Sequence, residues 1–210
     1  MSQSEMAVHT AHGVVIEEPP YGLSTIKLGL WLFIVADACT FATFLFGYGY
    51  VRICSLNWGT PFELGSILNG LVMTFVLLSS SLTMIAAGRA ASAGDKPAAN
   101  KWLWFTILLG VVFAALHLRE WFRMFGEGWS LAHNPTGGSQ MFGAAFFSVT
   151  GLHLTHVISG VIVLLIIKGG YNRGRYGIDH VENAGVYWHF VDVVWMFVFP
   201  LMYLMNAHVS

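Results

Sequence analysis

The amino-acid sequence predicts an all-α membrane protein in which five helices cross the bilayer. The chain is 56% hydrophobic and only 10% charged, whereas about 25% of the residues in soluble domains are charged. Five apolar segments are each about 20 residues or longer, which is the length that a helix needs to span a bilayer. The strands of a membrane barrel would instead give short alternating runs. Composition and pattern therefore both favour a helical bundle.

The connections between the predicted spans are rich in turn-forming residues. Glycine, proline, asparagine or aspartate occurs in each of them, as is typical of loops and tight turns. Residues 1–25 form a separate tail, whose acidic residues and prolines do not match a signal peptide. Residues 26–207 form one membrane domain, with spans at about 26–51, 66–88, 101–125, 141–168 and 184–207.

The distribution of basic residues predicts the orientation. With five spans, the N-terminus lies on the same side as the second and fourth connections. That side carries seven lysines and arginines, and the opposite side carries three. Because basic residues are more frequent in cytoplasmic segments, the N-terminus is expected to be cytoplasmic and the C-terminus periplasmic. The net charge of −1 argues against a nucleic-acid partner.

The first span contains an aspartate, Asp37, near the expected middle of the membrane. An ionisable group at this depth normally faces a protein interior, a partner or a water-filled path. One interpretation is a proton-accepting carboxylate or a contact with another subunit. The other is a neutral acid that forms a hydrogen bond to a neighbouring helix, since burial favours the protonated form. The sequence alone leaves both interpretations open.

The later spans carry further polar residues. His117 and Glu120 are three residues apart and therefore share one face of the third span. They form either a charged belt at the outer interface or, as we favour, a polar network that reaches into the bundle. In the fifth span His189 and Asp192 also share a face, and we expect either a charged pair or a neutral hydrogen bond between them.

A metal centre is the alternative use of these residues. The side chains that could serve by type as ligands of a two-metal site are His117, Glu120, His153, His156, Glu182, His189 and Asp192. Glu120 is expected roughly 8 Å below the outer surface and Glu182 at the opposite surface, so the whole set cannot converge on one ion. A smaller set of His153, His156 and His189 passes this depth criterion.

Four segments, taken in order, resemble subunit III of the haem-copper terminal oxidases. The first runs from Trp31 to Asp37, and the second from His117 to Trp121, where an acid precedes an aromatic residue. The third, from Phe146 to Val157, resembles the aromatic, Thr-Gly and paired-histidine signature of the family. The fourth, from Glu182 to Trp195, resembles its most diagnostic segment. Five spans resemble the short bacterial form, which would lie in the bacterial inner membrane.

The resemblance implies an accessory subunit of an oxidase that reduces O2 to water. Haem and copper would belong to subunits I and II, and this chain would pack beside subunit I and bind phospholipid. Asp37 would support proton uptake. The residues that would hold the bundle together and shape the lipid cleft are His117, Glu120, His153, His156, Glu182, His189 and Asp192. The complex could belong to a larger respiratory assembly.

Two departures from the family pattern bear on the type of oxidase. Asp37 occupies a position where many cytochrome c oxidases of the family carry glutamate and quinol oxidases often carry aspartate, which favours a quinol-type complex. Leu154 stands between the paired histidines, where glycine is common. Three alternatives stay open: a subunit III-like protein associated with nitric oxide reductase, a membrane metalloenzyme that uses the histidines, and a proton or ion channel that uses Asp37 and Asp192.

Overall fold

A computed structural model describes residues 10–11, 14–15, 24–55, 57–137 and 139–207 of the chain. Five long apolar helices account for most of it, each long enough to cross a membrane, which confirms the predicted class. Their bounds are Thr25–Cys54 for α1, Leu64–Ser92 for α2, Lys96–Gly126 for α3, Met141–Asn172 for α4 and Ile178–Met202 for α5, with the short 3-10 helix η2 at Leu204–Asn206.

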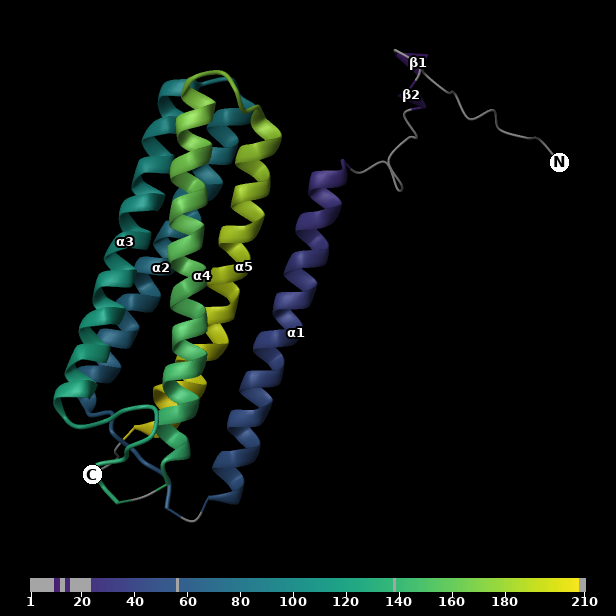
Figure 1. The fold of residues 1–210 in the computed structure, drawn as a ribbon. Coiled ribbons are helices and arrows are strands. Elements are labelled where there is room, and N and C mark those ends of the chain that lie inside the picture. Colours follow the sequence, from purple (N-terminus) through teal and green to yellow (C-terminus); the bar gives the residue numbers. More distant parts are fainter. Residues whose placement is uncertain (1–9, 12–13, 16–23, 56, 138, 208–210) are drawn as a thin grey trace.

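Helices α2 to α5 form a compact antiparallel bundle, and α1 lies against one side of it (Figure 1). Around the bundle α3 contacts α2 and α4, and α5 contacts the same two helices. Helix α1 touches only α4 and α5 to a substantial extent among the described residues. In the most apolar window of α1 11% of the residues are buried, against 50% in α5. The four-helix bundle is therefore the core, and α1 is an added helix.

The helix ends follow local capping signals. The side chain of Ser24 accepts a hydrogen bond from the Lys27 amide at 3.3 Å, and that of Asp95 accepts one from the Ala98 amide at 3.0 Å. Gly94, with φ of +76°, ends α2 in a conformation that favours glycine. Helix α5 starts at Ile178, six residues before the predicted span, because hydropathy detects only the apolar part of a helix.

The centre of the bundle is packed with large aromatic rings. Trp188 and Trp195 of α5 are both essentially buried, at 1% and 0% exposure. Two glycines make room for Trp188: a Cβ at Gly110 would lie 2.6 Å from its ring, and one at Gly160 would lie 3.0 Å away. The indole nitrogen of Trp188 donates to Ser80 Oγ of α2 at 2.9 Å. Close helix approach and aromatic packing thus hold α2 to α5 together.

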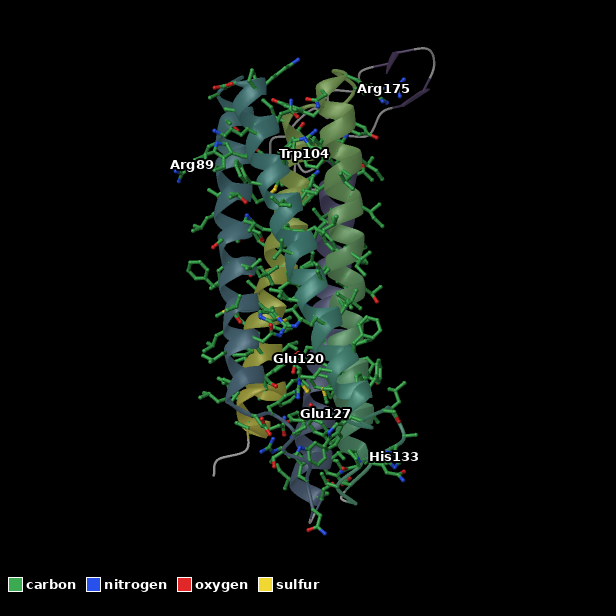
Figure 2. All side chains as sticks on the ribbon, turned by 90° about the vertical axis from the view of Figure 1, so that its left-hand side faces the viewer. Arg89, Trp104, Glu120, Glu127, His133 and Arg175 are labelled. Atoms are coloured by element: carbon green, nitrogen blue, oxygen red, sulfur yellow. The ribbon has the colours of Figure 1, made fainter. Side chains whose placement is uncertain are left out.

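The N-terminal tail enters the structure as two short strands, β1 (Thr10–Ala11) and β2 (Val14–Val15), which pair antiparallel. The other residues of the predicted tail before Ser24 lie outside the described residues. The start of α1 and the turn between α4 and α5 lie at one end of the bundle, and the end of α5 lies at the other (Figure 1). Figure 2 shows Arg89 and Arg175 at the first end and Glu120 and His133 toward the second.

Candidate functional site

The mid-helix junction between α1 and α4 is built from Asp37 and His156. Asp37 Oδ2 lies 2.6 Å from His156 Nε2, and the two side chains are 17% and 13% exposed. The ring of Phe41, one turn further along α1, meets the His156 ring edge-on at 5.3 Å between centroids. An ionisable pair is thus held at membrane depth with an aromatic ring covering one side.

The hydrogen bonds of His156 determine how many protons this pair holds. His156 Nδ1 lies 2.8 Å from the backbone oxygen of Leu152, which can only accept, so Nδ1 carries a hydrogen. One further proton then lies in the bond between Nε2 and Asp37. On the carboxyl group it gives two neutral partners, and on the imidazole it gives an ion pair. The proton can change sides without changing the net charge of the pair.

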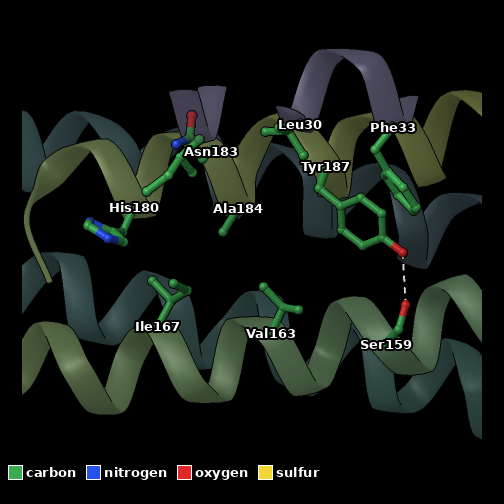
Figure 3. A pocket seen from close by; sticks show the side chains of 10 residues that line it. Leu30, Phe33, Ser159, Val163, Ile167, His180, Asn183, Ala184 and Tyr187 are labelled. Atoms are coloured by element: carbon green, nitrogen blue, oxygen red, sulfur yellow. Dashed lines mark hydrogen bonds between the residues drawn. The ribbon is translucent and has the colours of Figure 1, made fainter. Parts of the chain in front are cut away.

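Two apolar grooves flank this junction between α1 and the bundle. One, of about 380 Å³, lies beside the first turns of α1 and is lined mainly by aliphatic and aromatic side chains, among them Leu30, Phe33 and Val163. Figure 3 shows it with the Tyr187 hydroxyl hydrogen-bonded to Ser159 Oγ, at 2.8 Å. The other groove, of about 320 Å³, lies toward the opposite end of α1.

A second polar contact fixes the far end of α1. Asn206 of η2 is fully buried, and its amide group donates to the backbone oxygen of Met202 at 2.8 Å and to the Tyr48 hydroxyl at 3.0 Å. Asn206 Oδ1 accepts from Trp58 Nε1 at 2.7 Å and from Arg52 Nη1 at 2.5 Å. The Asn206 side chain thus joins the end of α1 to the C-terminal segment, and Tyr48 and Arg52 add direct bonds to the Leu201 and Met205 carbonyls.

The buried histidines His117 and His153 occupy the aromatic centre of the bundle. Both are completely buried, and the Trp195 ring lies between 5 and 6 Å from each, at 5.6 Å from His117 and 5.1 Å from His153. Phe113 packs against the same two rings, at 5.8 and 5.7 Å. Among the described residues none forms a hydrogen bond with either imidazole. These histidines are packed as aromatic rings in the core.

Glu120 forms a polar network near the end of α3. It is 4% exposed and accepts from Arg123 Nη2 at 2.8 Å and from Asn69 Nδ2 of α2 at 3.3 Å. Arg123 also pairs with Glu127. Glu120 thus contacts α2 through Asn69, whereas His117, which shares its helix face, lies in the aromatic core rather than in this network.

The polar residues of α5 do not form the contact expected between them. His189 Nδ1 lies 2.6 Å from Ser81 Oγ of α2. Asp192 is 6% exposed, and its Oδ1 is buried without a partner among the residues that the structure describes. No bond between His189 and Asp192 occurs in this part of the chain. Glu182 is exposed in the second turn of α5, away from these groups.

The candidate ligand side chains do not converge on one point in the described part of the chain. Within the described ranges there is no group of three or more His, Cys, Asp or Glu side chains that could hold a metal ion. The smaller set suggested by depth does not converge either: His153 packs on Trp195, His156 binds Asp37, and His189 binds Ser81. The rings that fill the space around His117 and His153 leave no room for a macrocycle.

Comparison with known proteins identifies the family of the chain. The family profile described as cytochrome c oxidase subunit III matches residues 4–207. The chain belongs to the cytochrome c oxidase subunit III family. It is 31% identical over 183 residues to cytochrome c oxidase subunit 3 of Alkalihalophilus pseudofirmus, covering 86% of each chain.

Relatives of the quinol type are similar to a comparable degree. The chain is 35% identical over 192 residues to a probable quinol oxidase subunit 3 of Staphylococcus epidermidis, covering 86% of this chain and 89% of the relative. It is 29% identical to the cytochrome bo(3) ubiquinol oxidase subunit 3 of Pseudomonas aeruginosa, over 85% and 84% of the two chains. This subunit III family member is therefore a multi-pass membrane protein and a subunit of a haem-copper oxidase of the cytochrome c or quinol type.

Two features of this subunit III were missed by sequence reasoning. The partnership between Asp37 and His156 joins residues 119 positions apart, so no local spacing reveals it. The network around Asn206 was also missed, because an asparagine near the end of a span is usually a residue at the membrane interface and gives no sign of buried partners. The long apolar spans with one arginine near the end of the first, Arg52, are the signal that could have suggested a buried partner for that cation.

Proposed function

We propose that this chain is an accessory, non-catalytic subunit that packs beside subunit I of its oxidase and supports proton uptake during sustained turnover. Haem and copper are assigned to the partner subunits in this proposal. The donor set in the described part of the chain supports that assignment, because its histidines lie in separate environments. The phospholipid and proton-uptake roles rest on the geometry around α1.

The Asp37–His156 pair is the observation that carries the proton-uptake role. The bond of 2.6 Å holds one proton that can lie on either partner, and both side chains retain some exposure. A pair of this kind can accept or release a proton at its exposed edge at a smaller cost than an isolated buried carboxyl group, because the imidazole stabilises the carboxylate. In this role Asp37 and His156 keep a proton available near subunit I.

The grooves beside α1 support the proposed binding of phospholipid. Both open toward the membrane and are lined almost entirely by apolar atoms, which suits an acyl chain. His180 and Asn183 lie at the end of the first groove that is near the start of α5, where a lipid headgroup would meet the interface (Figure 3). We therefore propose that each groove holds one acyl chain.

The orientation of the chain is also part of the proposal. The start of α1, the turn between α2 and α3 and the turn between α4 and α5 share one end of the bundle. Seven of the ten lysines and arginines lie in or near these segments. This excess supports a cytoplasmic N-terminus and a periplasmic C-terminus.

The proposed function is tested by substituting Asp37 in the purified complex. Asp37→Ala should reduce the number of turnovers completed before activity is lost, leave the haem absorption spectrum unchanged and leave the initial rate nearly unchanged. Thr40→Val is the matched control, because Thr40 lies one turn away and its hydroxyl bonds only the Ala36 carbonyl, at 3.0 Å, among the described contacts. Equal turnover lifetimes for wild type and Asp37→Ala would contradict the proton-uptake role.

A further inference from the structure

Helix α5 presents one continuous outward stripe beside α2. Its members recur every three or four residues and so lie on one face of the helix. Val193 and Met196, in the second half, are 54% and 44% exposed. The half-buried or exposed residues of this stripe are Glu182, Val186, His189, Val193, Met196 and Pro200.

The middle of this stripe is polar inside the membrane. His189 lies five residues after Ala184, where the apolar part of α5 begins, and so about 8 Å into the apolar interior of a bilayer, which is about 30 Å thick. Ser81 of α2 binds its Nδ1 at 2.6 Å, which leaves Nε2 for another group. Asp192 follows one turn later but is only 6% exposed and its Oδ1 is buried within the chain, so it does not belong to the outward stripe.

Lipid tails cannot satisfy His189 Nε2. An acyl chain has neither a donor nor an acceptor, so a polar side chain that faces it inside the membrane loses its hydrogen bonds. The outward face of α4 at the same depth is different, since Ile158 and Ile162 are exposed there and carry no polar atoms. The α4 face can lie against lipid, whereas the α5 face needs a protein neighbour that can form a hydrogen bond with it.

We infer that the face formed by Ser81, His189 and Val193 is the docking surface for a membrane-spanning helix of a partner subunit. The partner helix carries a hydroxyl or amide group opposite His189, which forms a hydrogen bond with His189 Nε2. The small side chain of Val193 beside it lets the partner backbone approach closely. This inference rests on the proposed function, in that the partner is a subunit of the same oxidase.

A steric test separates a protein neighbour from lipid. Val193→Trp should lower the amount of this chain that co-purifies with the oxidase by about tenfold, because a large ring inserted into a packed interface is costly. Ile158→Trp is the matched control, since Ile158 is 44% exposed at a similar depth on α4. It should leave co-purification unchanged. Equal retention of the two variants would overturn the docking surface.

A photo-crosslinking measurement tests the same surface without relying on the Val193→Trp variant, which could lose co-purification simply because it misfolds. A benzophenone amino acid is placed at position 193 or at position 158 of the chain within the intact complex. Position 193 should give an adduct with another oxidase subunit, and position 158 should give adducts with lipid only. Lipid adducts alone at 193, in a complex that retains the chain, overturn this inference and leave the proposed function standing. Failure of the wild-type chain to co-purify with any haem-containing subunit overturns both.

Discussion

The four-helix bundle and helix α1 are held in place by different kinds of contact. In α2 to α5, buried tryptophans and glycines bring helices close together, and hydrogen bonds such as that from Trp188 to Ser80 lie inside the packing. Helix α1 is attached through Asp37 at its middle and Arg52 and Tyr48 at its end, with apolar grooves between these points. Packing therefore builds the bundle, and polar contacts position α1 while leaving apolar grooves beside it.

This difference has a physical basis. Within a bilayer, apolar side chains gain little from leaving lipid, so helices associate through close packing and polar contacts. The bundle uses the first means and α1 depends mainly on the second. Changes to large core rings should therefore destabilise the whole chain, whereas changes to polar partners should loosen α1 alone.

The largest effect is expected in the bundle. Trp195→Ala removes a ring that contacts His117, His153 and Phe113 and leaves a cavity, which should lower the free energy of unfolding by about 3–5 kcal/mol. Unfolding in mixed micelles titrated with a denaturing detergent measures it. Phe197→Ala, at a position 59% exposed, is the control and should change little. A similar loss in both variants would show that the aromatic core is not what stabilises the bundle.

An intermediate effect is expected at the end of α1. Asn206→Leu removes the bonds of Arg52 and Tyr48 to this amide, at a cost of about 1–2 kcal/mol. The cost is limited because these two side chains keep their bond to each other and their bonds to backbone carbonyls. The loss should appear mainly as faster proteolysis between α1 and α2, while the unfolding of α2 to α5 changes less. Met205→Leu, at the exposed neighbouring residue, preserves the network as a control. Resistance to protease equal to that of wild type would contradict the role assigned to Asn206.

The smallest effect on stability is expected in the groove. Val163→Trp fills part of the space of about 380 Å³ and should change the free energy of unfolding by only about 0.5 kcal/mol. It should nevertheless reduce the phospholipid that remains bound to the purified complex, as counted by native mass spectrometry. Ile162→Trp, at an exposed neighbouring residue that does not line the groove, should leave the lipid count unchanged. An unchanged count in Val163→Trp would remove the support for an acyl chain at this site.

Sequence reasoning predicted the features that depend on neighbouring residues. Long apolar runs gave five helices, and turn residues such as Gly94 and Asp95 located a connection correctly. Helix α5 begins six residues before the predicted span, because its first two turns extend past the apolar segment and carry Asp179, His180 and Glu182. Hydropathy identifies the part of a helix that is apolar enough to lie in the membrane, whereas the helix itself begins where its backbone hydrogen bonding begins.

Contacts between helices were predicted less well. His189 and Asp192 share a face as expected, yet His189 binds Ser81 of α2 instead, since the neighbouring helix offers a closer partner. His117 and Glu120 also share a face, but one lies in the aromatic core and the other in the Arg123 network. Periodicity tells which residues share a side of a helix and does not reveal what the next helix presents there.

The most direct test of the polar attachment of α1 is a double-mutant cycle on Asp37 and His156. The stabilities of wild type, Asp37→Leu, His156→Leu and the double variant are measured in the same micelles. We predict a coupling of about 1–2 kcal/mol, because each single variant leaves one polar partner at membrane depth without its bond. Additive losses, with a coupling below about 0.5 kcal/mol, would contradict the account of how α1 is held.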